Sequence, residues 1–158
     1  MMMPPRMRAM AWRPLNAGER GLAHEMFGPG LDAARVRLLA LPVWPRAFVA
    51  GPRVIVWPAR HALADFAGAP LPVQATFVHE LTHVWQAQRG VMLALAKLRA
   101  GDGAQAYAYD LADGRAFAEL NIEQQASVVE HAFLASRGAA TPFARHLYAQ
   151  AASAWREV

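Results

Sequence analysis

The stretch FVHELTHVWQ, residues 77–86, carries two histidines four positions apart and a glutamate directly after the first. No residue between positions 72 and 89 breaks a helix, and Gly90 follows as a stop signal. On a helix, side chains four positions apart share one face, with about 6 Å between their Cβ atoms. The imidazoles of His79 and His83 can therefore converge on one metal ion.

Glu80 flanks the histidine pair on the same helix. A glutamate there can take a proton from water on zinc, whose pKa the metal lowers toward about 7, and can later pass it to a leaving amine. The spacing matches the H-E-x-x-H motif of metalloproteases. We therefore predict Zn²⁺ as the cofactor, His79 and His83 as ligands, and Glu80 as the catalytic residue.

The alternative is a core helix whose histidines are hydrogen-bonded to protein groups. Apolar residues surround the motif on nearly every side, which is typical of a buried helix; they are Val73, Phe77, Val78, Leu81, Val84 and Trp85. Unpaired polar atoms in such surroundings cost several kcal/mol, and a bound dication would satisfy all three polar side chains. Because buried glutamates are rare without a partner, the pattern favours a metal site.

The chain has 158 residues, which fits a single domain over residues 1–158. It contains no cysteine, so any metal must be held by His, Asp or Glu.

There is no apolar run of roughly 18 residues and no secretory signal, so no membrane span is predicted and the cytoplasm is the default location. Several methionines suggest that residues 1–16 are disordered or lie upstream of the true start. The net charge of +4 comes mainly from scattered arginines, which argues against nucleic acid as a partner.

Local patterns predict an α+β fold, mostly helical, with a small antiparallel sheet of two or three strands before the HELTH helix. Partial alternation, β-branched residues and a Gly-Pro turn indicate strands at 35–41, 46–50 and 53–57. Helices are expected at 17–26, 59–67, 72–89, 91–99, 117–137 and 142–157.

A catalytic zinc site usually has three protein ligands and one open position. Candidates for the third ligand lie in AELNIEQQASVVEHAF, residues 118–133; they are Glu119, Glu123, Glu130 and His131. The letters EQQA from Glu123 to Ala126 resemble the E-x-x-A element of gluzincins, the zincins whose third ligand is a glutamate on a second helix. The resemblance implies Glu123 as the ligand, with Ala126 letting the two helices approach closely. The other three candidates are then expected to contribute little to metal binding.

A closer resemblance covers roughly residues 27–135. RVRLLAL, RAFVAGPRVIVWP, FVHELTHVWQ, YAYD and EQQA follow one another and are similar to elements of the small predicted metallopeptidases found near bacterial contractile injection systems and Rhs or Vgr genes. The resemblance implies a minimal zincin fold in which His79, His83 and Glu123 bind zinc and Glu80 is the base.

One departure from the gluzincin pattern concerns the residue four positions after the ligand glutamate. Many gluzincins have an aspartate there that orients a ligand histidine, whereas this chain has Ser127. Serine can accept a hydrogen bond from a ring N–H but supplies no charge. Tyr109, with Tyr107 nearby, is a candidate for stabilising a developing oxyanion, and packing on the core is the alternative for both.

These patterns predict a zinc-dependent peptidase that acts on polypeptides, with the strands at 46–57 holding an extended substrate. The alternative function is a non-enzymatic, zinc-stabilised module that docks onto a secretion or toxin assembly. A basic nucleic-acid adaptor is a third hypothesis. Export by a contractile injection system, with a partner in that apparatus, is implied by the resemblance.

Overall fold

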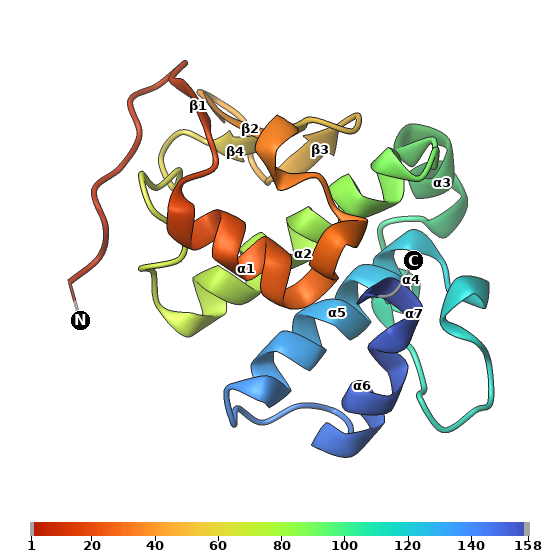
Figure 1. The fold of residues 1–158 in the computed structure, drawn as a ribbon. Coiled ribbons are helices and arrows are strands. Elements are labelled where there is room, and N and C mark those ends of the chain that lie inside the picture. The colour runs from red at the N-terminus through yellow and green to blue at the C-terminus, as the bar shows by residue number, and fades with distance from the viewer. Residues whose placement is uncertain (1, 157–158) are drawn as a thin grey trace.

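The computed structural model describes residues 2–156, and Figure 1 shows its α+β arrangement of a small sheet and a larger helical part. The sheet strands are β1 (Trp12–Pro14), β2 (Arg37–Leu41), β3 (Phe48–Ala50) and β4 (Val54–Pro58). The α-helices are α1 (Ala17–Phe27), α2 (Leu71–Gln88), α3 (Leu93–Ala100), α4 (Ala104–Tyr107), α5 (Ile122–Ser136), α6 (Arg145–Ala151) and α7 (Ser153–Arg156). Three short 3₁₀ helices are η1 (Gly28–Gly30), η2 (Ala33–Arg35) and η3 (Phe117–Glu119). The predicted fold class is confirmed.

The sheet is mixed, with strand order β1-β2-β4-β3. The pairs β1–β2 and β3–β4 are antiparallel, whereas β2 and β4 run parallel, with Leu38 opposite Ile55. The expectation of a purely antiparallel sheet of two or three strands was wrong in this detail. The chain turns back at Gly51, whose φ is +70°, and β4 inserts between β2 and β3. Parallel strands need a connection of about a dozen residues, which β3 and its flanking turns supply, and β3 is left at the edge.

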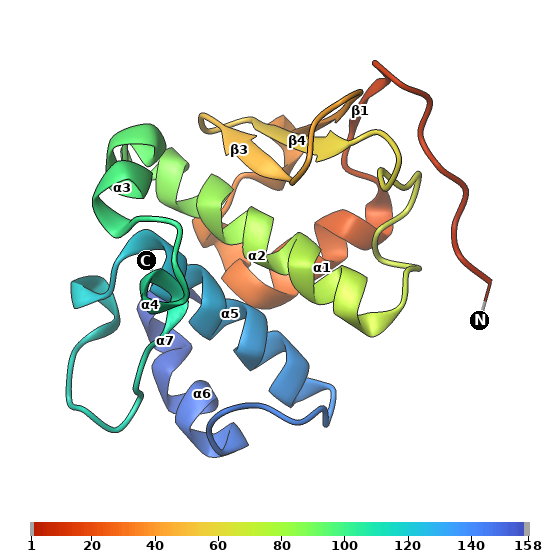
Figure 2. The same ribbon diagram turned by 180° about the vertical axis from the view of Figure 1, so that it is seen from behind.

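Helix α2 is the centre of the molecule. It packs on β3 and β4 on one side and most extensively on α5 on the other. Figures 1 and 2 show that α1 covers one face of α2, lying in front of it in Figure 1 and behind it in Figure 2. Phe77 of α2 stacks on Phe66, with ring centroids 5.0 Å apart, and Phe66 in turn packs on Trp57 of β4. These aromatic contacts fix α2 against the sheet.

The segment 59–67 forms turns, so the short helix expected there was wrong. Several of its backbone amides donate to turn or long-range carbonyls, as Ala64 does to Pro5 O, and two near its end donate to side chains. The Phe66 amide donates to the Glu19 carboxylate, and the Ala67 amide donates to Asp65. Glu19 is fully buried and also accepts a bidentate pair of bonds from Arg13.

The N-terminal segment 2–16 lies against the rest of the chain in the structure. β1 pairs with β2, the side chains of Met7 and Leu15 are buried, and Arg6 forms an isolated bridge with Leu63. Residue 1 lies outside the described residues.

The predicted helix over 117–137 is divided in two. After η3, Asn121 caps a new helix: its side chain accepts a hydrogen bond from the Gln124 amide, and the Gln124 side chain accepts one from the Asn121 amide. The cap starts α5 at Ile122, so Glu123 falls in its first turn.

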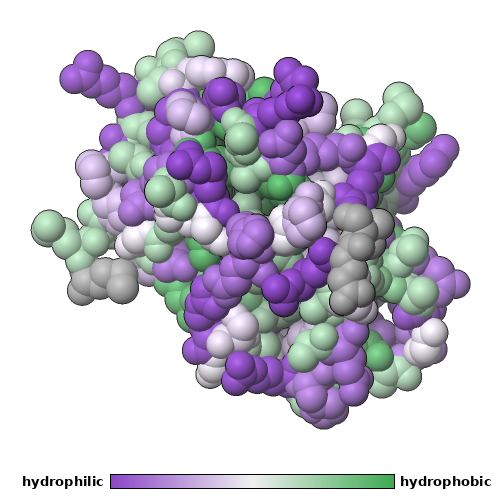
Figure 3. Space-filling view, in the orientation of Figure 1, coloured by the Kyte–Doolittle hydropathy of each residue, from purple (hydrophilic) through white to green (hydrophobic). Residues whose placement is uncertain are grey.

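Within residues 2–156, none of the helices is both long and apolar enough to cross a membrane. In the view of Figure 3, polar side chains are spread over the surface and apolar ones occur in small groups between them. This face therefore does not present a broad apolar surface.

Candidate metal centre

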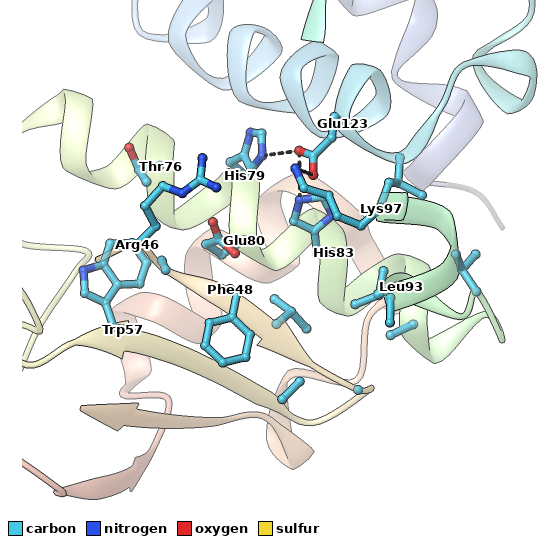
Figure 4. A pocket seen from close by; sticks show the side chains of 18 of the residues that line it. Arg46, Phe48, Trp57, Thr76, His79, Glu80, His83, Leu93, Lys97 and Glu123 are labelled. Atoms are coloured by element: carbon cyan, nitrogen blue, oxygen red, sulfur yellow. Dashed lines mark hydrogen bonds and ion pairs between the residues drawn. The ribbon is translucent and has the colours of Figure 1, made fainter. Parts of the chain in front are cut away.

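His79 and His83 lie on the face of α2 that borders a cleft between the sheet and α5 (Figure 4). Their side chains are largely buried, and their ring centroids are 5.0 Å apart with the ring planes nearly perpendicular. The four-residue spacing on one helix brings the two rings to the same place, as the sequence predicted.

Glu123 approaches the two histidines from the first turn of α5 (Figure 4). Its Oε2 atom lies 3.3 Å from His79 Nε2 and 3.4 Å from His83 Nε2. One ligand atom from each residue can be chosen so that all lie within 4.8 Å of one another. With metal–ligand bonds near 2.05 Å, the edges of a tetrahedron are about 3.3 Å long, so the two separations between Glu123 and the histidines match tetrahedral edges. The three residues form a candidate metal site.

Both histidine rings are oriented through their Nδ1 atoms. His79 Nδ1 lies 2.9 Å from Glu130 Oε2, and His83 Nδ1 lies 2.8 Å from Gln86 Oε1. The Gln86 amide nitrogen donates to Ile122 O and Gln125 Oε1, so its oxygen is the atom left to accept from His83. Each ring therefore donates from Nδ1 and presents Nε2 to the site.

Glu130 makes a contact that the sequence analysis did not foresee. It was expected to contribute little to metal binding, and Ser127 stands at the position where many gluzincins have the orienting carboxylate. Glu130 lies seven positions after Glu123, on the same face of α5 two turns along, so it reaches His79 beyond the ligand atom. The signal available in the sequence was this seven-residue spacing. The orienting charge is present, on a later turn of the helix than the family pattern implied.

The charges of the site are strongly coupled. Burial lowers the pKa of His79, but hydrogen bonds to Glu123 and Glu130 outweigh it and raise that pKa to about 10. Burial raises the pKa of Glu123, but its bonds to His79, His83 and Lys97 outweigh it and hold that pKa well below the usual range. In the absence of metal, a proton on His79 thus compensates the Glu123 carboxylate, and a dication would replace that proton.

Glu80 lies beside the three candidate ligands and points into the cleft (Figure 4). It is 7% exposed, and its Oε2 atom is buried without a hydrogen-bond partner in the described structure. Burial raises the pKa of the Glu80 carboxyl, and the positive charge of the neighbouring histidines partly offsets this. Burying a carboxylate oxygen without a hydrogen-bond partner costs folding free energy. Such an oxygen is typical of a group that has a functional partner.

Lys97 of α3 binds the other oxygen of Glu123. Its Nζ lies 2.6 Å from Glu123 Oε1 and 3.0 Å from the hydroxyl of Tyr107. The two Glu123 oxygens are therefore divided, with Oε2 facing the histidines and Oε1 facing the ammonium group. No pattern in the sequence pointed to Lys97, because it lies 26 positions before Glu123 on a separate helix.

The remaining candidates take different places. Tyr107 lines the cleft, whereas the hydroxyl of Tyr109 lies 2.6 Å from His131 Nδ1 and 2.7 Å from the hydroxyl of Tyr148, in contacts that join α5 and α6. Ser127 lines the cleft one turn after Glu123. Glu119 is exposed, and its carboxylate accepts a hydrogen bond from the Ala116 amide. The structure thus brings Tyr107, rather than Tyr109, next to the histidines.

The cleft beside the site has a volume of about 1180 Å³. Its sheet wall includes the edge strand β3 and the ring of Trp57, and its opposite wall includes α3 and the start of α5. The fold and the site together define an α+β protein with a buried His-His-Glu centre that opens on a large cleft.

Comparison with known proteins places the chain in a family. No protein-family model matches it. Over 138 residues it is 35% identical to the type VI secretion system spike protein VgrG2b of Pseudomonas aeruginosa, an alignment that covers 80% of this chain and 13% of that protein. The solved effector domain of Pseudomonas aeruginosa VgrG2b superimposes with a TM-score of 0.70 and 32% identity, over 95% of this chain and 86% of the solved chain.

The chain therefore belongs to the family of the VgrG2b effector domain. It corresponds to about 13% of the length of the spike protein, so the similarity concerns one part of that protein. Of the predicted resemblance, the link to a secretion-spike protein is confirmed, through its effector domain.

Proposed function

We propose that this protein is a zinc-dependent peptidase of minimal zincin architecture, with His79, His83 and Glu123 as the metal ligands and Glu80 as the general base. The observation that carries the proposal is the unpaired, buried Oε2 atom of Glu80 beside the three candidate ligands. A water molecule at the open side of the site would give that oxygen the hydrogen bond that the protein does not provide.

Zinc is the metal that this donor set suits best, because two imidazoles and one carboxylate with tetrahedral spacing are typical of catalytic zinc sites. A zinc ion held there would lower the pKa of water at its open position toward about 7 and polarise the scissile carbonyl. Glu80 accepts a proton from the attacking water while the oxygen of that water bonds to the carbonyl carbon. Glu80 then gives that proton to the amide nitrogen as the carbon–nitrogen bond breaks.

Other side chains support this arrangement. Glu130 and Gln86 hold the two histidine rings with Nε2 toward the metal. Lys97 holds Glu123 Oε1, which favours ligation through Oε2 alone. Tyr107, whose hydroxyl contacts Lys97, is placed in the cleft where a phenol could donate to a developing oxyanion, and Ser127 lines the cavity beside Glu123.

A polypeptide is the substrate class that the cleft favours. β3 is an edge strand with one side of its backbone unpaired by the sheet, and residues 47–50 line the cleft. An extended peptide can add to such an edge through main-chain hydrogen bonds, as predicted from the sequence for residues 46–57. The adjoining apolar side chains, Trp44, Phe48 and Trp57, offer contacts for its side chains.

The relative suggests how the protein reaches its substrate. VgrG2b is a type VI secretion system spike protein, and the solved part similar to this chain is its effector domain. We propose that this chain likewise acts as an effector delivered with a secretion spike, which would be its partner. The competing function is a zinc-stabilised docking module without activity. It is supported by the position of the three candidate ligands, because His79 and His83 lie on α2 and Glu123 lies on α5, so a bound zinc would link the two helices.

The Glu80→Gln variant separates these two functions. The amide keeps the shape of the side chain but cannot accept the proton, so zinc content should stay at about one ion per chain while hydrolysis falls by about 10²–10⁴-fold. Elemental analysis and digestion of a peptide library would measure both, with Glu119→Gln as a matched control on an exposed carboxylate. Equal cleavage by wild type and Glu80→Gln would exclude Glu80 as the base. A zinc-loaded wild type that cleaves no peptide would favour the docking module.

A further inference from the structure

Two cations from opposite walls of the cleft converge on one carboxylate oxygen. Arg46, in the loop between β2 and β3, lies with its Nη2 atom 3.8 Å from Asp102 Oδ1. Lys97 of α3 lies with its Nζ atom 3.3 Å from the same oxygen. Figure 4 shows Arg46 directed from the sheet side toward the metal centre and Lys97 entering from the helical side. The geometry therefore accommodates a carboxylate between the two side chains.

Asp102 occupies this position only weakly. The side chains of Arg46 and Asp102 are 70% and 71% exposed, and an ion pair so open to water contributes little to stability. Asp102 lies between two glycines, Gly101 and Gly103, in the loop that joins α3 and α4. A Cβ added at either glycine would meet nothing within 4 Å, so the loop is not packed against the body at these points. A competing carboxylate could displace Asp102 at small cost.

The carboxylates that line the cleft are engaged at the candidate metal centre. Glu123 contacts both ligand histidines and Lys97, Glu130 contacts His79, and Glu80 is buried beside the ligands. Arg46 also lines the cleft. Among the described residues, its ion-pair partner is the exposed Asp102. Its planar guanidinium group is suited to hold a carboxylate through two parallel hydrogen bonds.

We propose that Arg46 and Lys97 form a carboxylate-binding subsite, and that the peptidase prefers polypeptides with an acidic group close to the scissile bond. This inference rests on the proposed peptidase function and names its substrate class. Lys97 contacts both Asp102 and the ligand Glu123, so a single ammonium group separates the subsite from the metal centre. Since a strand rises about 3.3 Å per residue, the acidic group falls within about two residues of the bond that is cut. In the free protein, Asp102 takes the place of this group.

Peptide binding to the zinc-loaded Glu80→Gln variant tests the subsite without relying on hydrolysis. The probes are fluorescein-labelled, C-terminally amidated decapeptides that are identical except for Glu, Gln or Lys at one central position, which is moved along the peptide. A fourth peptide carries Gln and a free C-terminal carboxylate. At low ionic strength, anisotropy titration should give a Kd roughly three- to tenfold lower for the glutamate peptide than for its glutamine counterpart. A preference for the fourth peptide alone would instead assign the subsite to a chain terminus.

Two further substitutions and one control substitution in the Glu80→Gln background test the two sides of the subsite. Arg46→Glu should reverse the preference, so that the lysine peptide binds more tightly than the glutamate peptide. Asp102→Asn should lower the Kd of the glutamate peptide by about twofold or more, because the internal competitor loses its charge. Arg8→Glu makes the same charge change at an exposed position outside the cleft lining and should leave the order of the three peptides as it is.

The proposal is overturned if acidic and neutral peptides bind equally at every position, if no peptide binds, or if Arg46→Glu and Arg8→Glu give the same order of affinities. Failure of the peptidase function has a different signature. In that case the acidic peptides bind with the expected charge dependence, yet the wild-type protein cleaves none of them.

Discussion

The contact between Glu130 and His79 gives a sharp prediction about metal affinity. In Glu130→Gln the hydrogen-bond acceptor is kept but the charge is lost, and in Glu130→Ala both are lost. The Nδ1–Oε2 distance of 2.9 Å shows a direct hydrogen bond, and the Glu130 side chain is 26% exposed, so water replaces it only in part. Removal of such an orienting carboxylate typically weakens metal binding by about 10–100-fold, equivalent to about 1.4–2.7 kcal/mol.

A second effect of the same substitutions opposes the first. Burial lowers the pKa of His79, and the bonds to Glu123 and Glu130 raise it, to about 10 overall. Loss of Glu130 therefore lowers the pKa of His79 and weakens the competition between proton and metal. That competition grows about tenfold for each unit that the pH lies below the pKa, so it is much smaller at pH 9 than at pH 7. The loss of affinity should accordingly be larger at pH 9.

Competition with a zinc chelator at both pH values measures these affinities. Glu119→Ala and His131→Ala are the matched controls, since Glu119 is exposed and His131 contacts Tyr109 outside the ligand set. Both controls should stay within about twofold of wild type. Wild-type affinity in Glu130→Ala at pH 9 would refute the orienting role of Glu130.

Four further predictions concern the same structure. Glu123→Ala should lower zinc affinity by at least about tenfold, measured by chelator competition, and retention of wild-type affinity would mean that Glu123 is not a ligand. Because the pKa of His79 is raised from 6.5 to about 10 in the metal-free protein, zinc binding should release a proton and tighten about tenfold per pH unit between pH 7 and 9; a pH-independent affinity would contradict this. By the same shift, the stability that His79 gives the metal-free fold is fully present below pH 6.5 and is lost as the pH rises through about 10. Glu19→Ala should destabilise the protein by about 3–5 kcal/mol in urea unfolding, because the largely buried Arg13 loses its charge partner and the buried Phe66 amide loses its acceptor, whereas Glu25→Ala at an exposed pair should cost about 1 kcal/mol or less.

The local part of the site was predictable from the sequence alone. The HELTH motif specifies its own geometry, because helical periodicity places His79, Glu80 and His83 together wherever the helix lies. The apolar residues around the motif identified the helix as buried, and the structure confirms that Glu80 and His83 are less than 9% exposed. Strands at the predicted places were also found, since β-branched runs and a Gly-Pro turn are local signals.

The pairing of those strands was decided by tertiary structure. The parallel alignment of β2 and β4 depends on β4 inserting between β2 and β3, and no residue within a single strand encodes that order. The same holds for the segment 59–67, whose helix-compatible sequence forms turns because Glu19, far away in the chain, accepts the Phe66 amide. Long-range partners override a local preference when they satisfy a buried backbone group.

The sequence by itself therefore determined the helix that carries the candidate metal-binding histidines, the lack of thiolate ligands and the fold class. Only the tertiary structure decided which groups surround those histidines. The first turn of α5 brings Glu123 to the two histidines and two further turns bring Glu130 to His79, while α3 supplies Lys97. These partners are 26 to 51 positions apart in the chain, and their meeting depends on how α2, α3 and α5 pack. Periodicity acts over a few residues along one element, whereas contacts between elements are set by the core that they bury together.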